Sequence, residues 1–171
     1  MRTIILVLLL SPVILLAQKQ ETFLKLTDAA GLQVKGDATT RGFEKSITIL
    51  SFAAAGKNNS QLTFSMNITG ASADLKRAMN SGSLLPSGIL TVIQPNSGGG
   101  APLTMYTIKM ENIRVNSCSE SMGCNAVMTT TAVVSATRIG WTYYETDKTG
   151  KSVVSRKYGF DNDSGKEWVN F

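Results

Sequence analysis

Alternation between apolar and polar residues is the dominant pattern along most of the chain. Its clearest instance runs over residues 62–68, where every second position is apolar and the positions between are Thr, Ser and Asn. A period of two places successive side chains on opposite faces, so this stretch predicts a half-buried strand. Similar patterns predict further strands at 23–26, 42–52, 88–94, 103–115, 126–144 and 151–160.

Two of these strands carry specific predictions about which residues share a face. In 42–52, we expect Phe43, Ile47 and Ile49 on one face. In 126–144, β-branched and aromatic residues favour a strand over a helix, and Gly140 marks a bend or bulge near its end. One face of that strand is expected to hold Val127, Thr129, Thr131, Val133, Thr137, Ile139, Trp141 and Tyr143.

One segment, residues 71–82, has the spacing of a helix instead. Leu75, Ala78 and Met79 fall at positions i, i+3 and i+4 and make an apolar stripe. Ser72 is the expected N-cap, and Gly82 is expected at the C-terminal end. A helix of about three turns is marginal alone in water, so we expect it to pack on the sheet. The residue pattern therefore predicts a β-rich domain with one short helix.

The first residues of the chain have the composition of a secretory signal peptide. Arg2 supplies a positive charge, and residues 4–17 are almost all apolar and end at the small residue Ala17. The run is shorter than the roughly 20 residues that a membrane span needs, and Pro12 would kink a spanning helix. We therefore expect cleavage after Ala17, a secreted or periplasmic protein, and one domain over 18–171. A membrane anchor is the alternative.

The charge distribution gives little support for nucleic-acid binding. The chain has 17 basic and 12 acidic residues, a net charge of +5. The basic residues are scattered, and only Lys76 with Arg77 and Arg156 with Lys157 are neighbours in sequence. A nucleic-acid site gathers Lys and Arg on one stripe, often with aromatic residues between them. We expect no nucleic-acid partner.

The most informative absence in the sequence is that of histidine. Without histidine there is no Ser-His-Asp triad and no Cys-His dyad, and the commonest general base near neutral pH is missing. Gly150, Lys151 and Ser152 resemble the end of a phosphate-binding loop but lie between strands, which favours a hairpin turn. Asp161 and Asp163 could share a calcium ion, yet their spacing favours an Asx turn. We therefore predict no enzyme, and no catalytic, cofactor-binding or metal-binding residue.

The two cysteines, Cys118 and Cys124, lie in a polar segment that is expected to be a loop. In an exported protein this spacing predicts a local disulfide, which would stabilise the fold by about 2 kcal/mol through loop closure. Two free thiols are the alternative. A redox role is not favoured, because the spacing is not Cys-x-x-Cys.

The order of these features resembles the haemolysin-coregulated protein (Hcp) family, which forms the inner tube of bacterial type VI secretion systems. The most specific match is residues 47–52, Ile-Thr-Ile-Leu-Ser-Phe, which are similar to the family's Ile/Val-x-x-Leu-Ser-Phe strand. Residues 106–113 are similar to its Tyr-x-x-x-Leu-Glu-Asn-Val/Ile strand, and residues 73–82 to its single short helix. Three further stretches follow in the family's order: 138–143, 147–150 and 159–161.

The resemblance implies more about fold and function than the residue pattern alone. The implied fold is mainly β, a compact antiparallel β-barrel or sandwich of two packed sheets with one short α-helix at the side. Members of the family assemble as hexameric rings that stack into a tube and carry effectors, and they have no catalytic residue. For this chain the resemblance implies self-association into rings, with a secreted effector or another secretion-system protein as candidate partner.

Two features separate this chain from the tube subunits of that family. A tube subunit leaves the cytoplasm through the secretion machine itself and has no signal peptide. The segment 53–61, which corresponds to the long loop that helps rings stack in the family, is short here. Two functions therefore stay open: an exported Hcp-like structural protein that forms rings, and a monomeric exported binding or adhesion module that keeps only the fold.

Overall fold

The computed structural model describes residues 19–55, 60–96, 100–123 and 126–171. The predicted signal peptide and its cleavage site lie outside these residues. Within the described part, eight strands and one helix follow one another. They are β1 (Glu21–Thr27), β2 (Ile47–Ala54), β3 (Gln61–Asn67), α1 (Gly70–Ser81), β4 (Leu85–Gln94), β5 (Leu103–Met122), β6 (Met128–Thr146), β7 (Ser152–Asp161) and β8 (Lys166–Glu167).

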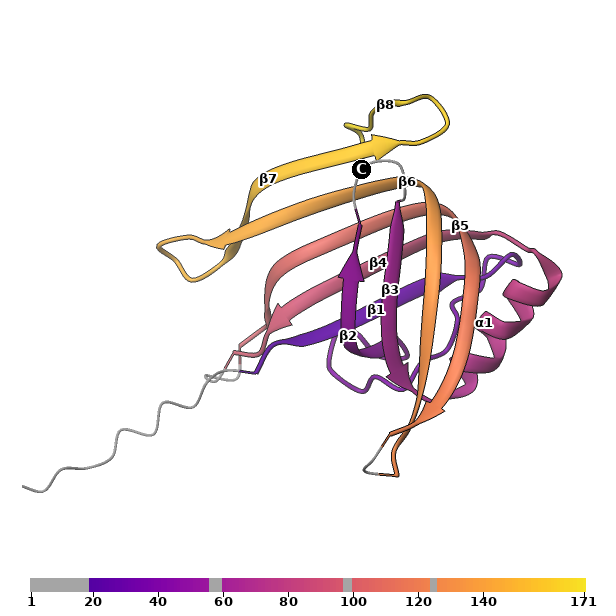
Figure 1. Ribbon diagram of the computed structural model, residues 1–171. Coiled ribbons are helices and arrows are strands. Elements are labelled where there is room, and N and C mark those ends of the chain that lie inside the picture. The colour runs from indigo at the N-terminus through magenta and orange to yellow at the C-terminus, as the bar shows by residue number, and fades with distance from the viewer. Residues whose placement is uncertain (1–18, 56–59, 97–99, 124–125) are drawn as a thin grey trace, which may run out of the picture.

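The strands form one antiparallel sheet that closes into a barrel (Figure 1). The strand order is β3-β2-β1-β4-β5-β6-β7-β8, and a further pairing between β3 and β6 joins the first six strands into a ring. β7 and β8 extend the sheet beyond the barrel along β6. This architecture confirms the mainly β barrel with a single short helix at its side. No described helix is long and apolar enough to cross a membrane.

The core fills the barrel with the apolar faces of the predicted strands. Leu62, Phe64 and Met66 of β3 are at most 1% exposed, as their alternation predicts. Leu75 and Ala78 of α1 are buried against the same cluster, which confirms the apolar stripe of the helix. The pairing of β4 with β5 ends at Ile113, and α1 packs beside β5 and covers the barrel beyond that point (Figure 1).

The second strand begins later than the sequence indicated, because residues 42–46 form turns. Gly42 and Lys45 have φ angles of 87° and 62°, a left-handed conformation that breaks a strand. Phe43 therefore does not share a strand face with Ile47. Its ring instead stacks on Phe23 at a centroid distance of 4.8 Å, in a small cluster apart from the main core.

The N-cap of α1 is Thr69 and not Ser72. The Thr69 hydroxyl accepts a hydrogen bond from the Ala71 amide at 3.3 Å, and the Ser72 hydroxyl accepts one from the Thr69 amide at 3.2 Å. This reciprocal arrangement is a capping box, in which Ser72 is the third helical residue. Gly82 ends the helix with a φ of 67°, as expected for a C-terminal glycine.

β5 and β6 are long enough to reach both sides of the barrel, and they bend together on the way. The buried residues Met110 and Ile113 of β5 are three positions apart, not two, and the same holds for Ala136 and Ile139 of β6. Asn112 lies at this point with a φ of 50°. On one side of the bend the even-numbered residues of a strand face the core, and on the other side the odd-numbered residues do.

This bend corrects the prediction of one continuous face along residues 126–144. Thr129, Thr131 and Val133 point away from the core, and the predicted face turns inward only from Ile139 onward. The core-facing residues of the first half are small: Thr130, Ala132, Val134 and Ala136. The alternation was read correctly, but its phase changes within the strand.

Asn162 stabilises the bend from the following segment. Its side-chain amide donates to the carbonyl oxygens of Ala136 and Thr137 at 2.9 and 3.0 Å, and to the Ser60 hydroxyl at 2.6 Å. Its backbone amide also donates to the Thr137 carbonyl at 2.9 Å. These bonds pair backbone groups at the bend, where unpaired buried carbonyls would be costly.

Candidate functional site

The acidic residues near the end of the chain form a turn and an ion pair. One carboxylate oxygen of Asp161 accepts hydrogen bonds from the Asp163 and Ser164 amides at 3.0 and 3.2 Å. Its other oxygen accepts from Nε of Arg138 at 3.0 Å. The Ser164 amide and the Arg138 guanidinium hold the pKa of Asp161 below its usual value. Among the described residues, no group of three or more His, Cys, Asp and Glu side chains could hold a metal ion.

Residues 147–151 form a hairpin turn, as predicted for the stretch that contains Gly150, Lys151 and Ser152. The Asp147 carboxylate accepts from the Thr149 hydroxyl and amide at 2.7 and 2.8 Å and from the Lys151 amide at 2.9 Å. These bonds lower the pKa of Asp147. The turn joins β6 to β7 directly and precedes no helix, so it lacks the context of a phosphate-binding loop.

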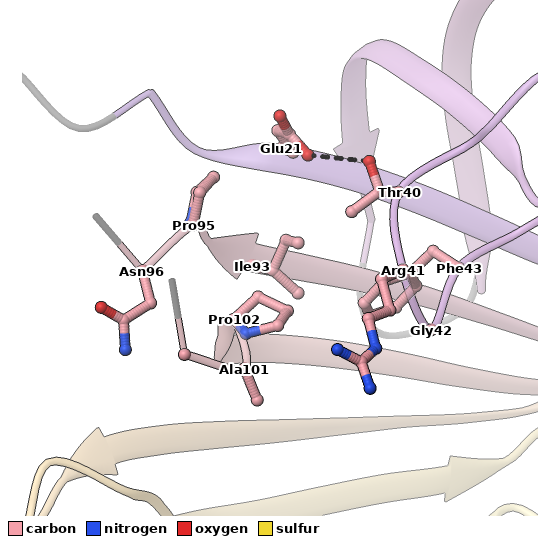
Figure 2. Close-up of a pocket in the computed structure, with 11 residues that line it drawn as sticks. Glu21, Thr40, Arg41, Gly42, Phe43, Ile93, Pro95, Asn96, Ala101 and Pro102 are labelled. Carbon is pink, nitrogen blue, oxygen red and sulfur yellow. Dashed lines mark hydrogen bonds between the residues drawn. The ribbon is translucent and has the colours of Figure 1, made fainter. Parts of the chain in front are cut away.

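A pocket of about 740 Å³ opens at one end of the barrel (Figure 2). Ile93, Pro95 and Pro102 give it an apolar lining between the ends of β4 and β5. At its rim, the Thr40 hydroxyl donates to Glu21 at 3.4 Å, and Arg41 extends its guanidinium on the far side from Asn96 (Figure 2). One carboxylate and one guanidinium are the ionisable groups among its described lining residues. The pocket can accept a small apolar group but has no pair of groups for acid–base chemistry.

Within the described chain, three strand segments of five residues or more have a strand neighbour on one side only. In β2, residues 50–54 pair with β3 but lie beyond the pairing with β1. In β5, residues 114–122 pair with β6 but lie beyond β4, and α1 packs alongside. In β7, residues 152–158 have β6 on one side only, whereas β8 pairs with residues 160–161 and the Trp168 amide donates to the Gly159 carbonyl. Such edges present unpaired amides and carbonyls to a further strand.

Two of these edges belong to the same four-stranded part of the barrel. The segments of β2 and β5 flank β3 and the first half of β6, in the order β2-β3-β6-β5. The outward face of this sheet, which we call the hydroxyl face, carries mostly small residues and one charged side chain, Arg114, which lies opposite Ser135. Its members are Ser51, Ala53, Gln61, Thr63, Ser65, Asn67, Arg114, Ser117, Ser119, Ser121, Thr129, Thr131, Val133 and Ser135.

A row of hydroxyl groups crosses the whole hydroxyl face. Ser51, Ser65, Thr131 and Ser119 lie opposite one another on the four neighbouring strands. The hydroxyls of Ser51 and Ser65 are 2.7 Å apart and hydrogen-bonded. The sequence pattern did not predict this surface, because residues 116–122 have the polar composition of a loop. The alternating serines at 117, 119 and 121 are the signal that could have found it.

Cys118 lies within β5 and not in a loop. It faces Ala132 of β6 and packs against the main core, and burial raises the pKa of its thiol. A thiol with a raised pKa is a weak nucleophile near neutral pH. Its predicted partner, Cys124, lies outside the described residues, so the disulfide stays a prediction.

These features define a class of protein. The described chain is a closed antiparallel β-barrel with one helix at its side and two further strands along one edge. The family model described as "Type VI secretion system effector, Hcp" matches residues 23–143. The chain therefore belongs to the Hcp family, whose members are structural, secreted tube proteins and not enzymes.

Solved structures of Hcp proteins have the same fold. Hcp1 from Salmonella typhimurium is 23% identical, with a TM-score of 0.70 over 87% of this chain and 99% of that one. A protein described as a type six secretion system protein is 22% identical, with a TM-score of 0.73 over 88% and 100%. The secreted protein Hcp3 from Pseudomonas aeruginosa is 15% identical, with a TM-score of 0.63 over 84% and 98%. Among curated protein sequences, none matches this chain.

Proposed function

We propose that the mature chain is exported and assembles into hexameric rings through the two edges of the hydroxyl-face sheet. The observation that carries this proposal is that β2 and β5 leave unpaired edges at opposite sides of one sheet. A ring requires two different surfaces on each subunit, each complementary to the other. Pairing the β2 edge of one copy with the β5 edge of the next continues the sheet from subunit to subunit and repeats the same interface.

In such a ring the hydroxyl faces of neighbouring subunits join into one continuous wall. The row that ends at Ser119 in one copy continues at Ser51 in the next, so the wall is hydroxyl-rich, with Arg114 as its charged side chain. We propose that this wall lines the space in which effectors are carried. Hydroxyl groups can both donate and accept hydrogen bonds and so suit polar cargo.

A cysteine pair tests the ring contact directly. Ser51→Cys and Ser119→Cys are combined in a chain whose own cysteines are replaced by serine. Within one subunit these positions are three strand spacings, about 14 Å, apart, whereas a disulfide needs Cα atoms within about 7 Å. Oxidation should therefore link neighbouring copies only, and a non-reducing gel should show a ladder that ends at the hexamer.

The matched controls separate edge pairing from a change in surface charge. Leu50 lies on the free β2 edge and Leu32 in a turn elsewhere, and both are more than half exposed. Leu50→Lys should weaken assembly in size-exclusion chromatography with light scattering, because lysine on an edge opposes strand pairing. Leu32→Lys should leave assembly unchanged. A strict monomer at high concentration, with no cross-linked ladder, would refute the ring proposal.

The second candidate function is a monomeric exported binding module, which the short connection between β2 and β3 favours. β2 ends at Ala54 and β3 begins at Gln61, so little chain is available for a stacking loop. A monomer with an intact fold by circular dichroism would support this function.

Export and the disulfide are tested on protein made by a bacterial host and collected from its periplasm. N-terminal sequencing should begin at Gln18. Intact mass before and after reduction should differ by two hydrogens for one disulfide per chain. Cys118 lies four residues before the end of β5, about 13 Å away along an extended strand, so a bridge to Cys124 requires the chain to fold back there.

A further inference from the structure

The outer edge of β7 is open along most of its length. Residues 152–158 have no strand on their outer side, while β8 pairs with Phe160 and Asp161 and the Trp168 amide donates to the Gly159 carbonyl at 2.9 Å. All side chains from Val153 to Tyr158 are exposed, and Figure 1 shows β7 at the margin of the molecule beyond the barrel. No other described strand covers this edge. The backbone edge of 152–158 and the face that carries Tyr158 are therefore accessible, whereas Lys157 on the other face contacts the C-terminal Phe171.

One face beside this edge is aromatic. Tyr158 lies opposite Trp141 of β6, and the two rings stack at a centroid distance of 5.8 Å. Tyr143 follows on the same face of β6 and lies opposite Arg156. Tyr158 and Tyr143 are 53% and 50% exposed. Half-exposed Tyr and Trp rings beside an Arg are the side chains that contribute most to protein interfaces.

The accessible charge of this region is basic. Lys148, Lys151 and Arg156 are exposed on the hairpin and on β7. Glu145, which accepts from the Ser155 hydroxyl at 2.7 Å, and Asp147, which accepts the hydrogen bonds of the turn, keep their negative charge but are outnumbered by these three basic residues. A partner at this edge therefore meets positive charge.

We propose that the β7 edge binds an extended acidic segment of a partner protein as an added strand. Backbone hydrogen bonds along 152–158 supply affinity in this mode of recognition, and alternate side chains of the added strand supply specificity. One set of side chains would contact the Trp141–Tyr158 pair. Carboxylates in the segment would face Arg156 and Lys151, where they complement the charge.

A second copy of the chain is a poorer occupant of this edge. Two β7 strands related by a twofold axis would pair antiparallel and place their basic residues close together, which is destabilising. The proposed rings use the edges of β2 and β5 instead. Binding at β7 therefore goes beyond the proposed function, and its failure would leave the ring contact untouched.

The test uses the full mature chain and a synthetic peptide, acetyl-Thr-Tyr-Thr-Glu-Thr-Glu-Thr-amide, whose Tyr and Glu side chains all lie on one face of an extended strand. Titration calorimetry should detect binding that weakens as salt is raised, and hydrogen exchange should slow at amides within 152–158. The same peptide with alternate amides N-methylated cannot complete the backbone ladder, so its affinity should fall by at least roughly tenfold. A version with lysine in place of every glutamate should not bind.

Two matched variants locate the site. Arg156→Glu should weaken peptide binding by roughly tenfold or more. Lys25→Glu makes an equal change of charge at an exposed position of β1 and should leave binding unchanged. The proposal is overturned if the peptide does not bind, if N-methylation has no effect, or if both variants weaken binding equally. Light scattering on the same samples tests whether a second copy of the chain binds this edge instead. If the protein is a dimer that the peptide dissociates and that Arg156→Glu also abolishes, the edge belongs to a second copy.

Discussion

The two halves of the β5–β6 hairpin are built from the same pair of strands but have opposite surfaces. In the half beyond the bend in β5, most outward side chains are small and all except Arg114 are uncharged, and together they form most of the hydroxyl face. In the other half, Trp141 and Tyr143 lie on one face, and Lys109 and Arg138 carry charge near the other. The bend at Asn112 divides the two. One hairpin thus supplies both the hydroxyl face and a surface of aromatic and charged side chains, because the set of alternate positions that faces the core changes once along it.

Substitutions in the core under the hydroxyl face should lower the free energy of unfolding more than substitutions elsewhere in the two halves. Phe64 is 1% exposed and lies opposite Ala132, whose small side chain leaves room for the ring. Phe64→Ala should lower the free energy of unfolding by about 3–5 kcal/mol, through lost burial and the cavity left behind. Urea denaturation at constant m-value measures this loss.

The matched change in the other half is Phe171→Ala. The Phe171 ring covers the outer side of Gly140 and Gly159, where a Cβ atom would approach it within 2.6 Å. It is only partly buried, so removing it should cost clearly less than Phe64→Ala. Equal losses would show that the barrel core is not the dominant source of stability.

The bend itself should give the next largest effect. Asn162→Ala removes the amide that donates to the Ala136 and Thr137 carbonyls and should cost about 1–3 kcal/mol. Asn170→Ala, at an exposed position, is the control and should cost almost nothing. If both variants unfold at the wild-type urea concentration, Asn162 does not hold the two halves in their different phases.

The sequence predicted most elements but not the bend that relates them. The alternation at 62–66 and the helical stripe of Leu75 and Ala78 depend on local periodicity, which burial in the structure confirms. Ile68, the last apolar residue of the predicted strand, lies beyond the end of β3 and is 38% exposed. The phase change between Ala136 and Ile139 depends on Asn112 and on Asn162, which is distant in sequence. No local pattern reports such a contact.

The candidate surfaces were less accessible to sequence reasoning than the fold. The serines of 117–121 lie in a polar stretch that by composition resembles a loop, and only their pairing with β6 identifies them as a strand. The free edges of β2 and β7 are properties of pairing, which a single sequence does not contain. The resemblance to the Hcp family nevertheless identified the correct barrel, because its motifs are distributed over most of the strands.

An acid titration sharpens the comparison at the charged side of the bend. Hydrogen bonds from Ser164 and Arg138 lower the pKa of Asp161 in the folded protein. A lowered folded-state pKa contributes stability that is present above the unfolded-state pKa and is lost as pH falls through the folded-state value. Wild-type stability should therefore decline below about pH 4, and Asp161→Asn should show a shallower decline over the same range. Thermal melts from pH 6 to pH 2 measure both slopes, and identical slopes would contradict the assignment.

The smallest predicted effect comes from two neighbouring threonines that face opposite ways. Thr130 is buried, and its hydroxyl is 2.8 Å from the Ser72 hydroxyl of α1, so Thr130→Val should cost about 1 kcal/mol by leaving Ser72 without that partner. Thr131 lies on the hydroxyl face, and Thr131→Val should change the free energy of unfolding by less than about 0.5 kcal/mol. The two substitutions are alike in residue type and strand. They differ only in whether the side chain points toward the core or away from it. If Thr131→Val is the more destabilising change, the outward hydroxyls hold the fold together, and the hydroxyl face is not a surface kept free for assembly.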